Sequence, residues 1–201
     1  MTATYTRHSM NVLVEKLESD GIVHICELKQ YDANTYSHSL NVAILSVSIG
    51  EVIGLNTRRL EKLALCALLH DIGKIFLPIS LINKPSRLTA DEFTLVKSHS
   101  DNGGLCLRRG FIRDRDIWVG VTHHHEKYNG TGYPKGLKRG KIPLFSRIIA
   151  VADVYDAVTS NRPYRTPMSS AKAIRLLMSE SGKAFDPAIV KAFLEAQRRI
   201  S

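Results

Sequence analysis

The chain has 201 residues, 44% of them hydrophobic, which is enough for one domain with a sizeable core. No run approaches the roughly 20 apolar residues of a membrane-spanning helix, and the first ten residues lack the apolar stretch of a signal peptide. The three cysteines lie far apart and are odd in number, which argues against a disulfide framework and predicts a reducing, cytoplasmic location.

The formal net charge is +9 at pH 7, from 28 basic and 19 acidic residues. This excess indicates either a solvated basic surface or a field that attracts a phosphate-bearing ligand. Long nucleic acid is a weaker candidate, because aromatic residues do not interleave with the basic positions as a stacking platform requires.

Helical periodicity dominates the first half of the sequence, and no segment has a clear strand pattern. We predict an opening helix within residues 1–30, followed by a largely buried helix over residues 40–53 that Gly54 ends. Asn56 or Thr57 is predicted to cap the next helix. Thr89 and Glu92 form a capping box, which predicts a helix running to about residue 100.

The second half continues in the same way. We predict a helix over residues 114–124, a long helix that Pro143 starts, a helix from Ser169 that Gly182 stops, and a last helix over residues 187–197. The fold class is therefore all-α. Residues 127–142 form the one long non-helical segment, and loops of this length inside compact domains are usually functional or disordered.

Residues that can bind metal interrupt several of these apolar helical segments. His70 and Asp71 end one of them, in the stretch LLHDIGK. An isolated pair of this kind is more typical of a structural hydrogen bond than of a metal site. The pair is not isolated, however, since the other interruptions are His38, His99, His124, His125 and Asp153. Imidazole and carboxylate ligands without cysteine suit iron, manganese, nickel or zinc, so the set predicts a metal centre.

The motifs HDIGK, HHEKYNGTGYP and ADVYDAVTSNRPYR, in this order, resemble those of the HD-GYP family of cyclic di-GMP phosphodiesterases. The resemblance covers residues 31 to 196 and includes YSHS, INKPSRLT and KSHS between those motifs. It implies an all-α HD-domain helical bundle with a long GYP-bearing loop. We assign this domain to residues 31–201 and expect connector helices at residues 1–30.

The resemblance also implies a ligand set for two metals that share Asp71. One metal would be held by His38, His70, Asp71 and Asp153, and the other by Asp71, His99, His124 and His125. Glu126 is expected to orient this shell, and Asp156 to hydrogen-bond a ligand histidine. Some family members hold a third metal through a glutamate at the position of Asn34. We therefore predict two divalent transition metal ions, with iron or manganese ahead of nickel or zinc.

The implied reaction is hydrolysis of cyclic di-GMP to the linear dinucleotide pGpG by a hydroxide that two metals activate, and the sequence leaves open whether pGpG is cut again to GMP. Asp71 would bridge the metals and Lys74 would contact the phosphate, so these two residues are the predicted catalytic pair. The predicted substrate contacts are Gly132, Tyr133 and Pro134 in the GYP turn, and Arg162 and Arg165 in NRPYR.

Two other hypotheses remain open. The chain could be an HD hydrolase of another cyclic dinucleotide or of a nucleotide, although the intact GYP motif argues against a generic nucleotidase. It could also be a catalytically silent module that senses a cyclic dinucleotide, although the complete two-metal ligand set argues against that. As partners we expect a second copy through the N-terminal helices, and a cyclase or other signalling domain at the GYP loop.

Overall fold

The computed structural model describes residues 32–110, 112, 114–160 and 166–200, and every structural statement below concerns these residues. The predicted opening helix lies outside them. The described chain is helical, with one isolated bridge between Ser181 and Phe185 in place of any strand, so the all-α prediction is confirmed. The α-helices are α3 (Ala33–Val52), α4 (Thr57–Leu68), α5 (Ile79–Ile82), α6 (Ala90–Arg109), α7 (Arg115–Thr122), α8 (Leu144–Thr159), α9 (Ser170–Ser179) and α10 (Pro187–Ile200).

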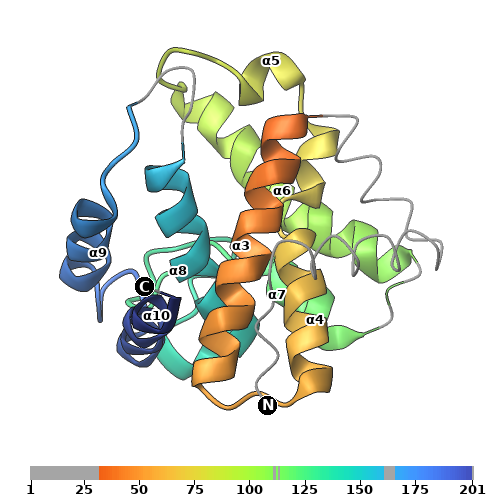
Figure 1. Ribbon diagram of the computed structural model, residues 1–201. Helices are drawn as coiled ribbons and strands as arrows, with labels where there is room; N and C mark the ends of the chain where they lie inside the picture. The colour runs from red at the N-terminus through yellow and green to blue at the C-terminus, as the bar shows by residue number, and fades with distance from the viewer. Residues whose placement is uncertain (1–31, 111, 113, 161–165, 201) are drawn as a thin grey trace.

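Helix α3 is the central element of the bundle (Figure 1). It packs against α4, α8 and α10, while α6 packs against α7 and the short 3-10 helix η1 (Ile72–Phe76). Apolar residues from α3, α4, α8 and α10 fill one continuous core. None of the described helices combines the length and the apolar character needed to cross a membrane.

Helix α3 begins seven residues earlier than the predicted start at residue 40. The carboxylate of Asp32 accepts hydrogen bonds from the backbone N–H groups of Asn34 and Thr35, which makes Asp32 the N-cap. Polar residues in the first two turns hid this start from the apolar pattern. As a result, His38 lies within the helix rather than ahead of it.

Helix α6 is also longer than predicted, because it continues from residue 100 to Arg109 through two adjacent glycines. Both glycines serve close packing. A Cβ atom at Gly104 would lie 1.8 Å from Thr122 Oγ1, and one at Gly103 would lie 3.1 Å from the backbone nitrogen of Gly73. His99 therefore stands in the middle of a rigid helix and not at its end.

Most of the predicted helix ends are confirmed. The Asn56 side chain caps α4, the Thr89–Glu92 capping box is complete, and Asp114 caps α7. Pro143 precedes the first residue of α8 and is its N-cap, one position earlier than predicted. Between α7 and α8 the chain forms only the three-residue 3-10 helix η2 (Arg139–Lys141), so the long loop is present as predicted.

Candidate metal centre

The carboxylate of Asp71 lies between two groups of histidines. Its Oδ2 atom is 3.4 Å from His70 Nε2, and its Oδ1 atom is 3.4 Å from His99 Nε2. Asp71 belongs to two candidate metal-binding groups. Within each group, the ligand atoms all lie within 4.8 Å of one another. The groups are Asp71, His99, His124 and His125, and His38, His70 and Asp71.

Five segments that are distant in the sequence deliver these side chains. His38 comes from α3, His99 from α6 and Asp153 from α8, whereas the other ligands follow the last turns of α4 and α7. Helix ends are suited to this task, since the chain can leave the apolar packing there and present a polar side chain. The seven residues that the sequence predicted as metal ligands thus lie around one point of the bundle, with Asp153 joined to the rest through His38.

Three of the histidines are aimed by their own helical turn. The Nδ1–H groups of His70, His99 and His124 donate to the carbonyl oxygens three residues earlier, at 2.7, 2.6 and 2.6 Å. These carbonyls belong to Ala67, Val96 and Val121. A histidine held in this way is protonated on Nδ1, which leaves the Nε2 lone pair for a metal.

The arrangement of these Nε2 atoms fits a cation. His99 Nε2 lies 3.3 Å from His124 Nε2, and in neutral rings held through Nδ1–H both atoms carry lone pairs that face each other. His70 Nε2 is buried without a hydrogen-bond partner among the described residues. Neither arrangement is favourable unless a positive ion accepts the lone pairs. The donor set therefore fits divalent transition metals.

The protonation states point the same way. Burial lowers the pKa of His99, of His124 and of His125, for the last to about 3, so that all three rings are neutral at pH 7. Burial by itself would raise the pKa of Asp71, but Lys74 and His70 hold it well below its usual range. Metal ligands must be deprotonated, and these four groups already are.

His38 lies between two carboxylates on α8. Its Nε2 atom is 3.0 Å from Asp153 Oδ1, and its Nδ1 atom is 2.6 Å from Asp156 Oδ2. Burial alone would lower the pKa of His38, but the hydrogen bonds to both aspartates raise it to about 9. Asp156 therefore contacts a candidate ligand as expected. The sequence did not reveal that Asn41 and Ser160 both donate to Asp156 Oδ1, at 3.0 and 2.9 Å.

Lys74 reaches back to Asp71. Its Nζ atom donates to Asp71 Oδ2 at 2.5 Å, and its side chain is partly exposed. The lysine is held there by η1, which follows Asp71 directly. A cation thus stands beside the shared carboxylate, on the side that opens to solvent.

Glu126 has a different role from the predicted one. It is buried, and its two oxygens accept the backbone N–H groups of Lys135 at 2.7 Å and Leu137 at 3.0 Å. No described ligand histidine hydrogen-bonds it, and its other close contact is His123 Nδ1 at 3.6 Å. Glu126 therefore anchors the GYP loop instead of orienting the metal ligands.

The GYP turn (Gly132, Tyr133 and Pro134) packs directly on the candidate ligand His125. Tyr133 N–H donates to the carbonyl of His125 at 3.2 Å, and the two rings lie 4.8 Å apart between centroids. A Cβ atom at Gly132 would meet His125 O at 2.5 Å, so only glycine allows this approach. Pro134 follows through a cis peptide bond. Arg162 and Arg165, the other predicted substrate contacts, lie outside the described residues.

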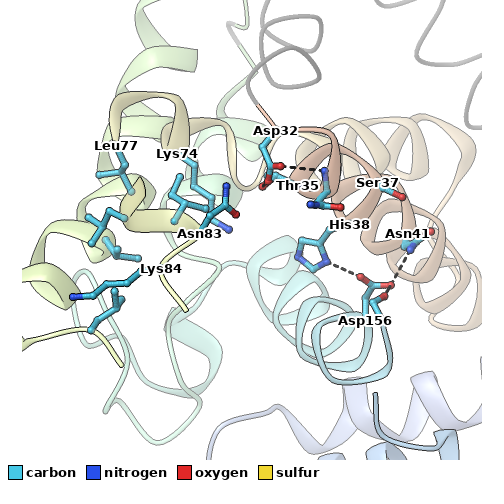
Figure 2. Close-up of a pocket in the computed structure, with 16 residues that line it drawn as sticks. Asp32, Thr35, Ser37, His38, Asn41, Lys74, Leu77, Asn83, Lys84 and Asp156 are labelled. Carbon is cyan, nitrogen blue, oxygen red and sulfur yellow. Dashed lines mark hydrogen bonds and ion pairs between the residues drawn. The ribbon is translucent and has the colours of Figure 1, made fainter. Parts of the chain in front are cut away.

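A pocket of about 370 Å³ opens beside the site (Figure 2). It shares His38, Lys74 and Asp156 with the candidate metal centre, and residues from α3 and α8 form one wall. The opposite wall comes from the segment between η1 and α6. This volume lies at the lower end of the range for ligand pockets, which runs from roughly 300 to 1,000 Å³. Asn34 lines the pocket and is exposed.

Comparisons with known proteins agree on the fold and the family. A family model described as HD domain matches residues 22–189. A cyclic di-GMP phosphodiesterase of Pseudomonas aeruginosa is 39% identical over 181 residues, which is 88% of this chain and 42% of that protein. One of Thermotoga maritima is 39% identical over 177 residues, or 87% of this chain and 48% of that protein.

Among solved structures, an HDG"Y"P protein of Bdellovibrio bacteriovorus matches with a TM-score of 0.67 at 22% identity, over 82% of this chain and 52% of that one. This likeness shows the fold alone. The chain spans about half the length of the curated relatives it matches. Since the family model covers most of the chain, and the HDIGK and GYP motifs stand at the site, the chain belongs to the HD domain family, in its HD-GYP group.

Proposed function

We propose that this domain is a metal-dependent phosphodiesterase that hydrolyses cyclic di-GMP to pGpG or, by a second cleavage, to GMP. The observation that carries the proposal is the position of Asp71, which is shared between two groups of candidate ligands beside a pocket that opens to solvent. The names of the relatives from Pseudomonas aeruginosa and Thermotoga maritima support the choice of cyclic di-GMP as substrate.

The site would hold two divalent transition metal ions, with iron or manganese preferred to nickel or zinc. We assign His38, His70, Asp71 and Asp153 to one ion, and Asp71, His99, His124 and His125 to the other. When bound, such ions act as Lewis acids on the phosphate and lower the pKa of a water molecule to near neutrality. In the overall reaction water adds to phosphorus, the bond to the 3′ oxygen breaks, and that oxygen takes a proton.

The chain's own residues prepare this reaction. Burial keeps His99, His124 and His125 neutral, and Lys74 helps to keep Asp71 ionised, so these four ligands need no deprotonation before they bind, whereas His38 must lose a proton. Lys74 lines the pocket within reach of Asp71, where its ammonium group would hold a non-bridging phosphate oxygen. Asp156 fixes His38, and Glu126 holds the GYP loop against His125.

The test is anaerobic turnover of cyclic di-GMP by protein loaded separately with ferrous iron, manganese, nickel or zinc. Chromatography separates pGpG from GMP, and the Asp71→Ala variant serves as the control. We expect metal-dependent hydrolysis that is lost in the variant. Tight binding of cyclic di-GMP without cleavage by fully loaded protein would overturn the proposal and favour a sensor module.

The setting of this activity is also proposed. A second messenger of this kind acts inside the cell, so we place the enzyme in the cytoplasm. The GYP loop presents the exposed basic side chains of Lys127, Lys135, Lys138 and Arg139, which supports contact with a cyclase or other signalling domain. The proposed homodimer depends on residues 1–30, which lie outside the described residues.

A further inference from the structure

The pocket beside the metal centre has a second half that the proposed chemistry does not use. Its far wall is apolar and is formed by Leu77, Leu81, Ile82, Leu88 and Val96. Metal ligation and phosphate contact need only the end that holds His38, Lys74 and Asp156. An apolar wall next to a phosphate site fits a ligand that has a flat ring close to its phosphate.

Two polar side chains, Asn83 and Lys84, also line this half of the pocket, and Lys84 is paired with Glu92. Asn83 lines the pocket on the wall that faces α3 (Figure 2), and its side chain is exposed. The described residues make no hydrogen bond to its amide, although its backbone N–H closes α5 through Ile79 and Leu81. The amide can both donate and accept, so it can pair with the edge of a ring whose faces lie on the apolar wall.

The segment that carries Asn83 is held firmly. Leu81 is buried beneath it, and Lys84 donates to both carboxylate oxygens of Glu92, at 2.6 and 2.7 Å. Glu92 in turn accepts the backbone N–H of Thr89 at 2.8 Å and completes the cap of α6. The backbone that carries Asn83 is therefore held in place before a ligand arrives, which lowers the entropy lost on binding.

We propose that the apolar half of this pocket is a nucleobase subsite, in which one base of the cyclic dinucleotide lies on Leu77, Leu81, Ile82, Leu88 and Val96 and Asn83 pairs with its edge. This inference rests on the proposed function and extends it, because it assigns recognition of the base to a segment outside the metal ligands. Asn83 is a specificity residue and takes no part in bond breaking.

Two substitutions test the pairing. Asn83→Ala removes the amide and should raise the KM for cyclic di-GMP about 2- to 10-fold, the usual effect of one neutral hydrogen bond, while kcat stays unchanged. Asn83→Asp leaves a side chain that only accepts hydrogen bonds. Guanine and adenine present different donors and acceptors, so this variant must change the ratio of kcat/KM between cyclic di-GMP and cyclic di-AMP.

Matched controls separate base recognition from chemistry. Ser86→Ala and Ser86→Asp place the same changes on an exposed residue of the same segment that does not line the pocket. Bis(p-nitrophenyl) phosphate is a phosphodiester without bases, so substitution of Asn83 should change the KM for this compound less than the KM for cyclic di-GMP. A rise in KM shared by the Ser86 variants, or an Asn83→Asp ratio equal to that of the wild type, would overturn the subsite.

The same proteins also distinguish failure of the subsite from failure of the proposed function. If the wild type hydrolyses no cyclic dinucleotide, equilibrium dialysis of cyclic di-GMP and cyclic di-AMP still measures the effect of Asn83. Weaker binding in Asn83→Ala alone would then support the subsite and contradict the enzyme. Turnover of cyclic di-GMP that the Asn83 variants leave unchanged would support the enzyme and contradict the subsite.

Discussion

His38 and Asp156 are joined by a 2.6 Å hydrogen bond across 118 residues of sequence. This contact fastens α3 to α8 at the candidate metal centre, and Asn41 and Ser160 hold the other oxygen of the same carboxylate. Asp156 is thus fixed from both sides, and it fixes the ring of His38 in turn.

Asp156→Asn should weaken metal binding. The amide either turns an NH₂ group toward His38 or keeps only a neutral acceptor, and loss of such a partner typically costs about 10- to 100-fold in metal affinity. The measurement is competition with a chelator of known affinity. Asp91→Asn, at an exposed position in the first turn of α6, is the control. Equal affinity in both variants would contradict the role assigned to Asp156.

Gly73→Ala should destabilise the metal-free protein. The new Cβ would lie 1.9 Å from the carbonyl oxygen of His99, so η1 and α6 must move apart. Overpacking of this kind costs about 1–3 kcal/mol in the free energy of unfolding, which urea denaturation measures. Gly140→Ala is the control, since a Cβ there meets nothing within 4 Å. A loss of the same size in both variants would show that the η1–α6 contact is not the cause.

Glu126→Gln should loosen the GYP loop. Both carboxylate oxygens accept backbone N–H groups, and the NH₂ group of glutamine would face one of these donors, at a cost of about 1–3 kcal/mol. Faster hydrogen exchange at the amides of Lys135 and Leu137 would report the change. Glu61→Gln, at an exposed position on α4, should leave both amides protected as in the wild type.

Asp114 gives a prediction for acid pH. Burial alone would raise the pKa of this carboxyl, but the 2.5 Å ion pair with Lys62 and the capped N–H of Asp116 lower it. A carboxyl whose pKa is lower in the folded state stabilises the protein above about pH 3.9, and this stabilisation is lost as the pH falls below that value.

Asp114→Asn isolates this effect, because asparagine is also a good N-cap. At pH 7 we expect a loss of about 0.2–1 kcal/mol in the free energy of unfolding. The loss should shrink only as the pH falls below about 3.9, and it should reach zero below the lowered pKa of folded Asp114, where both proteins carry a neutral side chain. Denaturation at a series of pH values provides the check, and a difference independent of pH would assign the effect to the cap alone.

The sequence missed parts of two helices that carry the candidate site. The apolar pattern missed the start of α3, because Asp32 caps a first turn made of polar residues. It also ended α6 near residue 100, short of the two glycines that packing against Gly73 and Thr122 requires. Only the second error concerns tertiary contacts, which a pattern along the chain does not contain, because the Asp32 cap is local.

The identity of the candidate ligands could be read from the motifs, whereas their convergence could not. Spacing along the chain says nothing about the distance between α3 and α8, so the sequence predicted that Asp156 contacts a ligand histidine but not that this histidine is His38. The role of Glu126 was missed for a similar reason. Its partners, Lys135 and Leu137, offer backbone groups, and a backbone N–H leaves no mark on the sequence.

The way His70, His99 and His124 are held has a consequence for how this centre tolerates change. Each ring takes its direction from a carbonyl within its own turn, so direction is a local property of the segment. The separation between the rings depends instead on how the helices pack. Substitutions in the distant core would therefore alter the distances between the three Nε2 atoms and leave the orientation of each ring unchanged. Such changes should shift the preference among metals of different size before they abolish binding.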